Sequence, residues 1–271
     1  MRKILKLLRL VLLSLPRVIF EYFQWILPYS RHPEKAPIEK RYAKARSLVV
    51  FILRNMHFDL RAEEEGILNV DKPCLFVANH VSAIDPLTLI ALSKRPVSFI
   101  AKKEAKKIIV VGRFIRAIDG LFLDRSDAFQ AVKLFRQAKA NMEQKNLSYA
   151  IFPEGTRTKE PYSGKLLPFH AGSLKIAYMA RAPIVTYAQF GSFHVLDKKP
   201  GPWHIVSILG LKTREYDDYN AVKSVDLINT LQEEIQVGAQ KLIDADNAYY
   251  GSKENKKRPH KWWKDALKKG D

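Results

Sequence analysis

Beyond Phe58, short apolar runs alternate with longer amphipathic stretches. The runs are bounded by Pro, Gly or charged residues, as buried strands are. We predict strands over Cys74–Ala78, Val97–Ala101, Leu121–Leu123, Tyr149–Phe152, Ile184–Phe190 and Ile205–Leu209. Helical spacing predicts helices over Pro86–Leu92, Asp127–Met142, Ala171–Ala180 and Val225–Ala245. This alternation favours an α/β domain over residues 58–250, with a mixed, largely parallel sheet flanked by helices.

The first 27 residues are charged on one helical face and apolar on the other. Arg2, Lys6, Arg9, Arg17 and Glu21 recur at helical intervals, opposite Leu, Val, Ile and Phe. The charges leave no apolar stretch of the ~18 residues that a membrane span needs. We expect an amphipathic helix lying in the plane of a membrane surface; packing on the protein's own core fits the same pattern.

Proline and aromatic residues refine this N-terminal prediction. Pro16 should break or kink the helix, and Pro28–Pro37 has the composition of a linker. A second helix is predicted from Ile38 to about Met56, and it either shares the membrane or leads into the globular core. The segment 1–57 is therefore predicted to associate with a membrane, with four aromatic residues at the interface: Phe20, Tyr22, Phe23 and Trp25.

The net charge of +18 lies mainly at the two ends of the chain. Residues 1–46 hold 11 Lys or Arg against 3 Glu, and residues 251–271 hold 8 against 3 acidic residues. Basic ends are attracted to anionic surfaces, which favours the cytoplasmic face of a cell membrane, with peripheral or monotopic attachment. The basic tail 251–271, with Trp262 and Trp263, suits either an interface anchor or a solvated end. Nucleic acid is the rival partner, but no zinc-finger spacing or glycine–aromatic RNA-binding signature supports it.

Composition narrows the chemistry. A hydrophobic content of 47% argues against disorder. Cys74 is the only cysteine, which excludes a disulfide framework and a cysteine-based metal site. It lies in an apolar run, where an inert buried thiol is expected. The histidines show no metal-ligand spacing, so no metal is predicted.

The predicted strand Cys74–Ala78 leads into the motif Asn79-His80-Val81-Ser82-Ala83-Ile84-Asp85. Because Pro86 suits the first position of a helix, we predict that Asp85 is its N-cap and that His80 lies on the loop before it. A carboxylate facing His80 would fix the imidazole tautomer and leave the other nitrogen as a base. The alternative is that Asp85 is only a cap and His80 a polar loop residue.

Two further predicted strands lead into polar loops that carry arginine. Leu121–Leu123 runs into Asp124-Arg125, and Tyr149–Phe152 runs into Pro153-Glu154-Gly155-Thr156-Arg157. Ligands in open α/β sheets bind at the carboxyl ends of strands, so these loops and His80 are predicted to share a cleft. Arg125 and Arg157 suit a phosphate, and Gly155 permits close backbone approach. Each Arg alone is equally consistent with a surface salt bridge.

Four ordered blocks resemble those of the glycerolipid acyltransferases. They are Asn79–Asp85, Leu123–Arg125, Phe152–Arg157 and Ala182–Val185, and their order and spacing match over about residues 73–190. The resemblance implies transfer of a fatty acyl group from an acyl thioester, acyl-CoA or acyl-ACP, to the free hydroxyl of lysophosphatidate, giving phosphatidate with no cofactor. It implies His80 as general base and Asp85 as its partner.

The resemblance also implies the acceptor site. Arg157, with Glu154, Gly155 and Thr156, would hold the acceptor, and Arg125 would assist with its phosphate. Two positions depart from the family pattern: Thr186 stands where a second proline is common, and His170 where many relatives carry Lys. Lys102 and Lys165 are candidate substitutes for that Lys in binding the phosphate.

Two other functions stay open at this point. One is an acyltransferase acting on glycerol-3-phosphate or another lysophospholipid. The other is a non-catalytic protein that binds a membrane surface or nucleic acid. A Ser–His hydrolase built on Ser82 is disfavoured because the sequence has no Gly-x-Ser-x-Gly elbow.

Overall fold

Seven strands form one sheet in which spatial order differs from chain order. The computed structural model describes residues 12, 14–63, 68, 70–124, 127–196 and 203–252. In the sheet the order is β1-β7-β6-β2-β5-β3-β4. The strands are β1 (Phe58–Glu63), β2 (Leu75–Ala78), β3 (Val97–Lys102), β4 (Leu121–Leu123), β5 (Ser148–Ile151), β6 (Ile184–Phe190) and β7 (His204–Arg214). All neighbours are parallel except β6 and β7, which confirms the predicted mixed, largely parallel sheet.

Successive residues of the central strands enter two different cores. On β2, Phe76 and Ala78 join the cluster on one face of the sheet, and Leu75 and Val77 join the cluster on the other. Side chains of a strand alternate between faces, so a strand covered on both sides is apolar at most positions. This is why largely apolar runs marked β2, β5 and β6 in the sequence; the buried polar side chains of β6, Thr186 and Gln189, are hydrogen-bonded.

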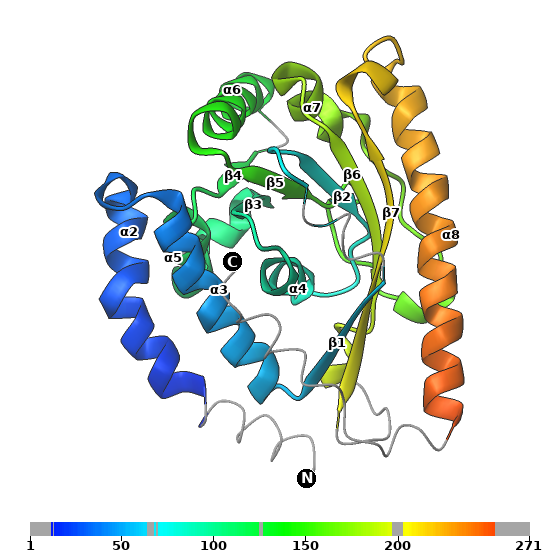
Figure 1. The fold of residues 1–271 in the computed structure, drawn as a ribbon, viewed down its shortest axis with the longest axis horizontal. Coiled ribbons are helices and arrows are strands. Elements are labelled where there is room, and N and C mark those ends of the chain that lie inside the picture. The colour runs from blue at the N-terminus through cyan, green and yellow to red at the C-terminus, as the bar shows by residue number, and fades with distance from the viewer. Residues whose placement is uncertain are drawn as a thin grey trace.

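Helices cover both faces of the sheet (Figure 1). One core is built with α2, α3, α4 and α5, and the other with α6, α7 and α8. The helices are α2 (Leu27–Arg31), α3 (Ile38–Asn55), α4 (Asp85–Leu92), α5 (Ile109–Ala117), α6 (Ala128–Lys145), α7 (Lys175–Ala180) and α8 (Ser224–Gly251). The predicted helix Ala171–Ala180 begins instead as a 3₁₀ turn, Ala171–Leu174, before α7.

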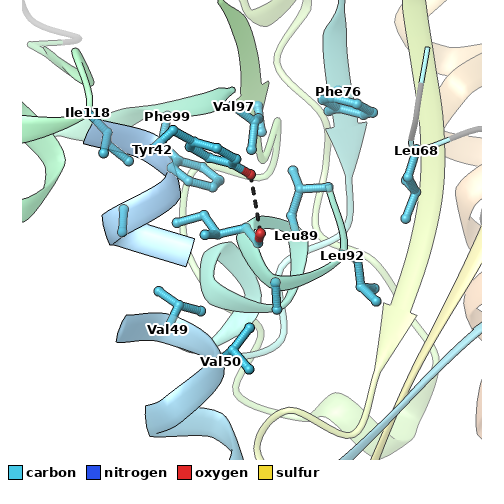
Figure 2. Packing of buried hydrophobic residues seen from close by; sticks show 14 of the residues in the cluster. Tyr42, Val49, Val50, Leu68, Phe76, Leu89, Leu92, Val97, Phe99 and Ile118 are labelled. Carbon is cyan, nitrogen blue, oxygen red and sulfur yellow. Dashed lines mark hydrogen bonds between the residues drawn. The ribbon is translucent and has the colours of Figure 1, made fainter. Parts of the chain in front are cut away.

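Helix α3 packs into the globular core, which is one of the two alternatives left by its sequence. Its buried residues include Tyr42, Val49 and Val50, which pack towards Leu89 of α4 (Figure 2). The Tyr42 hydroxyl donates to the carbonyl of Ile90 at 3.2 Å, so the buried polar atom is satisfied. This contact fixes α4, and therefore its first residue Asp85, relative to α3.

The helix before α2 differs from the predicted pattern in two ways. Residues 14–21 are helical through Pro16, so the expected break is absent from this described stretch. A π-helical turn, Tyr22–Ile26, precedes Pro28, and the backbone N–H of Leu27 donates to Tyr22. Because Pro28 has no N–H to donate, the local hydrogen-bond pattern shifts without ending the helix.

The aromatic residues of this helix divide between core and surface. Trp25 is fully buried: its ring meets Phe114 of α5 edge-on, and its Nε1 donates to Glu21. The prediction that Trp25 lies at a membrane interface is therefore wrong, whereas Phe20 and Phe23 are exposed. No helix among the described residues has the length and apolar character to cross a membrane. Residues 1–11 and the tail 253–271, with Trp262 and Trp263, lie outside the described residues.

Candidate active site

His80 and Asp85 face each other at the carboxyl end of β2. His80 lies on the loop after the strand, and its Nδ1 is 2.8 Å from Oδ2 of Asp85. Asp85 is fully buried as the first residue of α4, and Ile84 occupies the N-cap. The predicted N-cap role of Asp85 is wrong: its side chain turns back to the loop because that loop supplies hydrogen-bond donors.

Four donors converge on the Asp85 carboxylate. Oδ2 accepts the backbone N–H groups of Val81 at 2.7 Å and Ser82 at 2.8 Å, besides His80, and Oδ1 accepts the hydroxyl of Ser192. These bonds compensate the burial of a charged group. A carboxylate only accepts, so Nδ1 of His80 carries the hydrogen and Nε2 presents a lone pair. No described residue hydrogen-bonds to Nε2, which leaves it available as a base.

The loop after β5 holds His80 from three sides. The backbone N–H of His80 donates to Oε1 of Glu154 at 2.6 Å, and its carbonyl accepts the N–H of Thr158 at 3.1 Å. The Phe152 ring stacks on the imidazole with centroids 4.3 Å apart and an interplanar angle of 11°. The predicted convergence of the β2 and β5 loops is therefore confirmed by direct contacts.

Glu154 is buried inside this arrangement. Its second oxygen, Oε2, accepts the backbone N–H of Leu167 at 2.9 Å, so each carboxylate oxygen is used by a backbone donor. Burial raises the pKa of Glu154 above its usual value, and the hydrogen bonds from Leu167 and His80 act in the opposite direction. Both oxygens of Glu154 thus hold backbone segments of the site, whereas the family resemblance implied that Glu154 contacts the acceptor.

Gly155, Thr156 and Arg157 form the outer part of the same loop. Gly155 has φ of 67°, a left-handed conformation that favours glycine, and its N–H closes a turn on the carbonyl of Phe152. Thr156 and Arg157 are exposed. Arg157 makes no ion pair with another described residue and directly precedes Thr158, whose N–H bonds to His80. Its guanidinium is therefore available to bind a ligand.

The other predicted binding residues are less closely tied to His80. Lys102 ends β3 at the same sheet edge, and its Nζ lies 3.8 Å from Glu104. Lys165 and His170 are exposed on the segment that returns past Glu154, where the N–H of His170 donates to the carbonyl of Pro153 at 3.1 Å. Arg125 lies outside the described residues, next to Asp124, which pairs with Lys103 at 2.7 Å.

A buried amide pair behind the motif was not identified from the sequence. Asn79 and Gln189, at the ends of the neighbouring strands β2 and β6, exchange three hydrogen bonds of 2.9 Å. The hydroxyl of Thr88 joins Gln189 at 3.2 Å to the carbonyl of Asp85 at 2.7 Å. The network fixes the start of the His80 loop relative to β6, which then delivers Ser192 to Asp85.

The described part of the site holds no grouping suited to a metal. Among the described residues, no cluster of three or more His, Cys, Asp or Glu is placed to bind an ion. Cys74, six residues before His80, is buried, and burial raises the pKa of its thiol to about 12. The thiol is therefore protonated near neutral pH, which agrees with the predicted inert cysteine.

Comparisons with known proteins agree with this geometry. Residues 59–189, which include His80, Asp85 and the loop after β5, match the model of the Acyltransferase family. A probable 1-acyl-sn-glycerol-3-phosphate acyltransferase from Mycoplasma genitalium is 32% identical over 196 residues, covering 68% of this chain and 70% of the relative. The enzyme of that name from Cocos nucifera is 30% identical, covering 58% of this chain and 52% of the relative.

A solved structure has the same fold. The crystal structure of the 1-acyl-sn-glycerophosphate (LPA) acyltransferase PlsC from Thermotoga maritima has a TM-score of 0.68 and 25% identity, covering 89% of this chain and 98% of that one. The chain spans about half the length of some of its curated relatives. The four sequence blocks, the ordered His–Asp pair and these matches lead to one conclusion: this chain belongs to the acyltransferase family.

Proposed function

We propose that this chain transfers a fatty acyl group from an acyl thioester to the free hydroxyl of 1-acyl-sn-glycerol-3-phosphate, giving phosphatidate. The donor is acyl-CoA or acyl-ACP. It is a co-substrate, and the reaction needs no separate cofactor. The observation that carries the proposal is the His80 geometry: Nδ1 is bonded to a buried carboxylate and Nε2 is left as a base. The relatives named for this reaction support the choice of acceptor.

The reaction needs one proton to be moved twice. Nε2 of His80 removes the proton of the acceptor hydroxyl while its oxygen attacks the thioester carbonyl carbon. The tetrahedral intermediate collapses, the C–S bond breaks, and the imidazolium returns the proton to the leaving thiolate. Asp85 stabilises the imidazolium between these events, and general-base catalysis of this kind contributes ~10²–10⁴-fold. A thioester is already activated, so no covalent intermediate with the protein is required.

We assign acceptor binding to the exposed residues of the loop that follows β5. Arg157 has the planar, bidentate donor geometry that suits a phosphate and lies beside the residue that bonds to His80. Lys102, Lys165 and Arg125 are further candidate phosphate contacts. Because both oxygens of Glu154 accept backbone N–H groups, we assign Glu154 to positioning His80 and not to direct contact with the acceptor.

The acceptor is a lipid, so the enzyme would work at a membrane surface. The exposed Phe20 and Phe23 on the N-terminal helix, and the basic residues of the segment 1–57, support peripheral attachment at the cytoplasmic face. We expect no nucleic acid partner.

The purified protein should be assayed against a panel of acceptors with both donors. We expect acyl transfer to lysophosphatidate to be faster than to glycerol-3-phosphate or to lysophospholipids with a larger headgroup. Faster transfer to one of those acceptors would make that compound the substrate, and the proposed acyl-transfer reaction would still hold. Absence of transfer to every acceptor with either donor would refute the proposed reaction.

A further inference from the structure

Helices α5 and α6 begin with apolar residues that are exposed to solvent. The start of α5 exposes four consecutive apolar residues, and the start of α6 exposes Phe129 and Val132. Phe129 is 83% exposed, more than any other large apolar side chain of the described residues. We name this surface the apolar rim; it consists of Ile108, Ile109, Val110, Val111, Phe129 and Val132.

The topology places the rim at the same sheet edge as His80. Helix α5 follows β3 and leads to the parallel strand β4, and α6 follows β4 and leads to β5, which is also parallel to β3. A helix that connects parallel strands begins at their carboxyl edge. His80 lies at that edge too, after β2. The ion pair between Lys103 and Asp124, at 2.7 Å, ties the segment before α5 to the segment before α6.

Basic residues accompany the apolar rim. Lys106 and Lys107 directly precede Ile108, and Lys133 and Arg136 follow Phe129 on α6; all four are exposed. None of them pairs with an acidic side chain in the part of the chain that the structure describes. Apolar side chains beside unpaired cations match the two layers of an anionic bilayer surface, in which acyl chains lie below negatively charged headgroups.

We propose that the apolar rim inserts into a bilayer containing anionic phospholipid and holds the His80 edge of the sheet against it. The occupant is a lipid surface because the rim combines apolar residues with cations, whereas a second copy of this equally basic chain would bring like charges together. Helix α5 also packs against the N-terminal helix through Phe114 and Trp25, so the two membrane contacts would be held in a fixed relation.

The proposal rests on the proposed function only in placing a lipid acceptor at the same surface. It adds a second docking element, separate from residues 1–57, and gives it a role: a lysophosphatidate in the bilayer would meet His80 without leaving the membrane. A rim mutation should therefore affect reaction with membrane-bound acceptor more than reaction with dispersed acceptor.

The test compares the full-length protein with the variant Ile109→Ser/Val111→Ser/Phe129→Ser. The control is Val225→Ser/Val237→Ser on α8, where both valines are 58% exposed, against 67% for Ile109. Binding to phosphatidylcholine vesicles with and without phosphatidylglycerol is measured by co-sedimentation. We expect the rim variant to bind the mixed vesicles at least about tenfold more weakly, and the control to bind as the unmodified protein does.

Two rate measurements separate loss of membrane binding from loss of catalysis. With a short-chain, water-soluble lysophosphatidate the rim variant should retain its rate, while its rate with vesicle-bound lysophosphatidate should fall with its binding. Unchanged vesicle binding by the rim variant would overturn the proposal, as would light scattering that shows the rim joining two copies of the chain. If the unmodified protein acylates no acceptor, the proposed function fails, and the vesicle measurement still decides the role of the rim.

Discussion

Glu154 accepts a hydrogen bond from the backbone N–H of His80 at 2.6 Å, while its other oxygen accepts from Leu167. One buried carboxylate thereby joins the catalytic loop to the segment that returns past it. The imidazole is positioned through its backbone as well as through its ring, because Phe152 stacks on one face and Asp85 bonds to Nδ1. The loop after β5 and the first residue of α4 thus determine the direction of Nε2 together.

Replacing Glu154 by Gln should lower kcat while leaving KM for the acyl donor nearly unchanged. The amide offers one acceptor where the carboxylate offers two, so one buried backbone N–H loses its partner. That loss costs about 1–3 kcal/mol, which corresponds to roughly ten- to a hundredfold if it acts on the geometry of His80. Steady-state kinetics check this, with Glu160→Gln on the exposed loop as control. A large change in KM for the acceptor alone would instead show that Glu154 contributes to acceptor binding.

Ser192→Ala removes the one hydroxyl among the described residues that donates to the Asp85 carboxylate. We expect kcat to fall by about tenfold, because the buried carboxylate keeps three donors but loses the contact that fixes Oδ1. The matched control is Ser30→Ala, whose hydroxyl bonds to the carbonyl of Leu27 within α2. An activity loss equal in the two variants would mean that Ser192 has no part in positioning Asp85.

Arg157→Ala should raise KM for lysophosphatidate far more than KM for the acyl thioester. Loss of a charge-assisted, bidentate contact to phosphate costs about 1.5–3 kcal/mol, or roughly ten- to a hundredfold in binding. Lys159→Ala removes an exposed cation from the same loop and serves as the control. Equal effects of Arg157→Ala on both substrates would exclude a specific role in phosphate binding.

A buried ion pair gives an acid-sensitive contribution to stability. Burial acts to raise the pKa of Asp119, but its bonds to Arg41 and Lys145 outweigh burial and hold the pKa below its usual value. A lowered carboxyl pKa stabilises the fold above the unfolded pKa of about 3.9, and the contribution is lost as pH falls through the folded pKa.

Asp119→Asn should therefore lower the free energy of unfolding at neutral pH, by about 3–5 kcal/mol, because Arg41 stays buried without its partner. The difference from the unmodified protein should shrink as the pH falls below about 4. Urea unfolding across this pH range measures it, with the exposed Asp217→Asn as control. A difference independent of pH would mean that the Asp119 charge does not account for the loss.

The strands that are covered on both faces of the sheet were predicted well from the sequence, and the edge strand β1 was not. Apolar runs identified the central strands, but β1 has Asp59, Arg61 and Glu63 at alternate positions, as an edge strand can. Helix α5 was missed because its first turn is apolar yet exposed and because Gly112 lies inside its short run. Trp25 was misplaced since periodicity does not distinguish a helix face against protein from one against lipid.

Within the site, local motifs were predictable and long-range partners were not. The His80–Asp85 pair is five residues apart, whereas Ser192 reaches Asp85 across 107 positions through the fold. Thr186, where the family commonly has a second proline, donates its hydroxyl to Glu234 of α8, which pairs in turn with Arg214. Thr186 thus helps to attach β6 to α8 through a long-range hydrogen bond that could not be predicted from the sequence.

The role of His80 as general base is tested most directly by His80→Ala. Acyl transfer from a thioester to lysophosphatidate should be measured on vesicles to which the variant demonstrably binds. We predict that transfer falls by at least ~10²-fold while vesicle binding and the unfolding midpoint stay close to those of the unmodified protein. Acyl transfer by His80→Ala at the unmodified rate would contradict the mechanism.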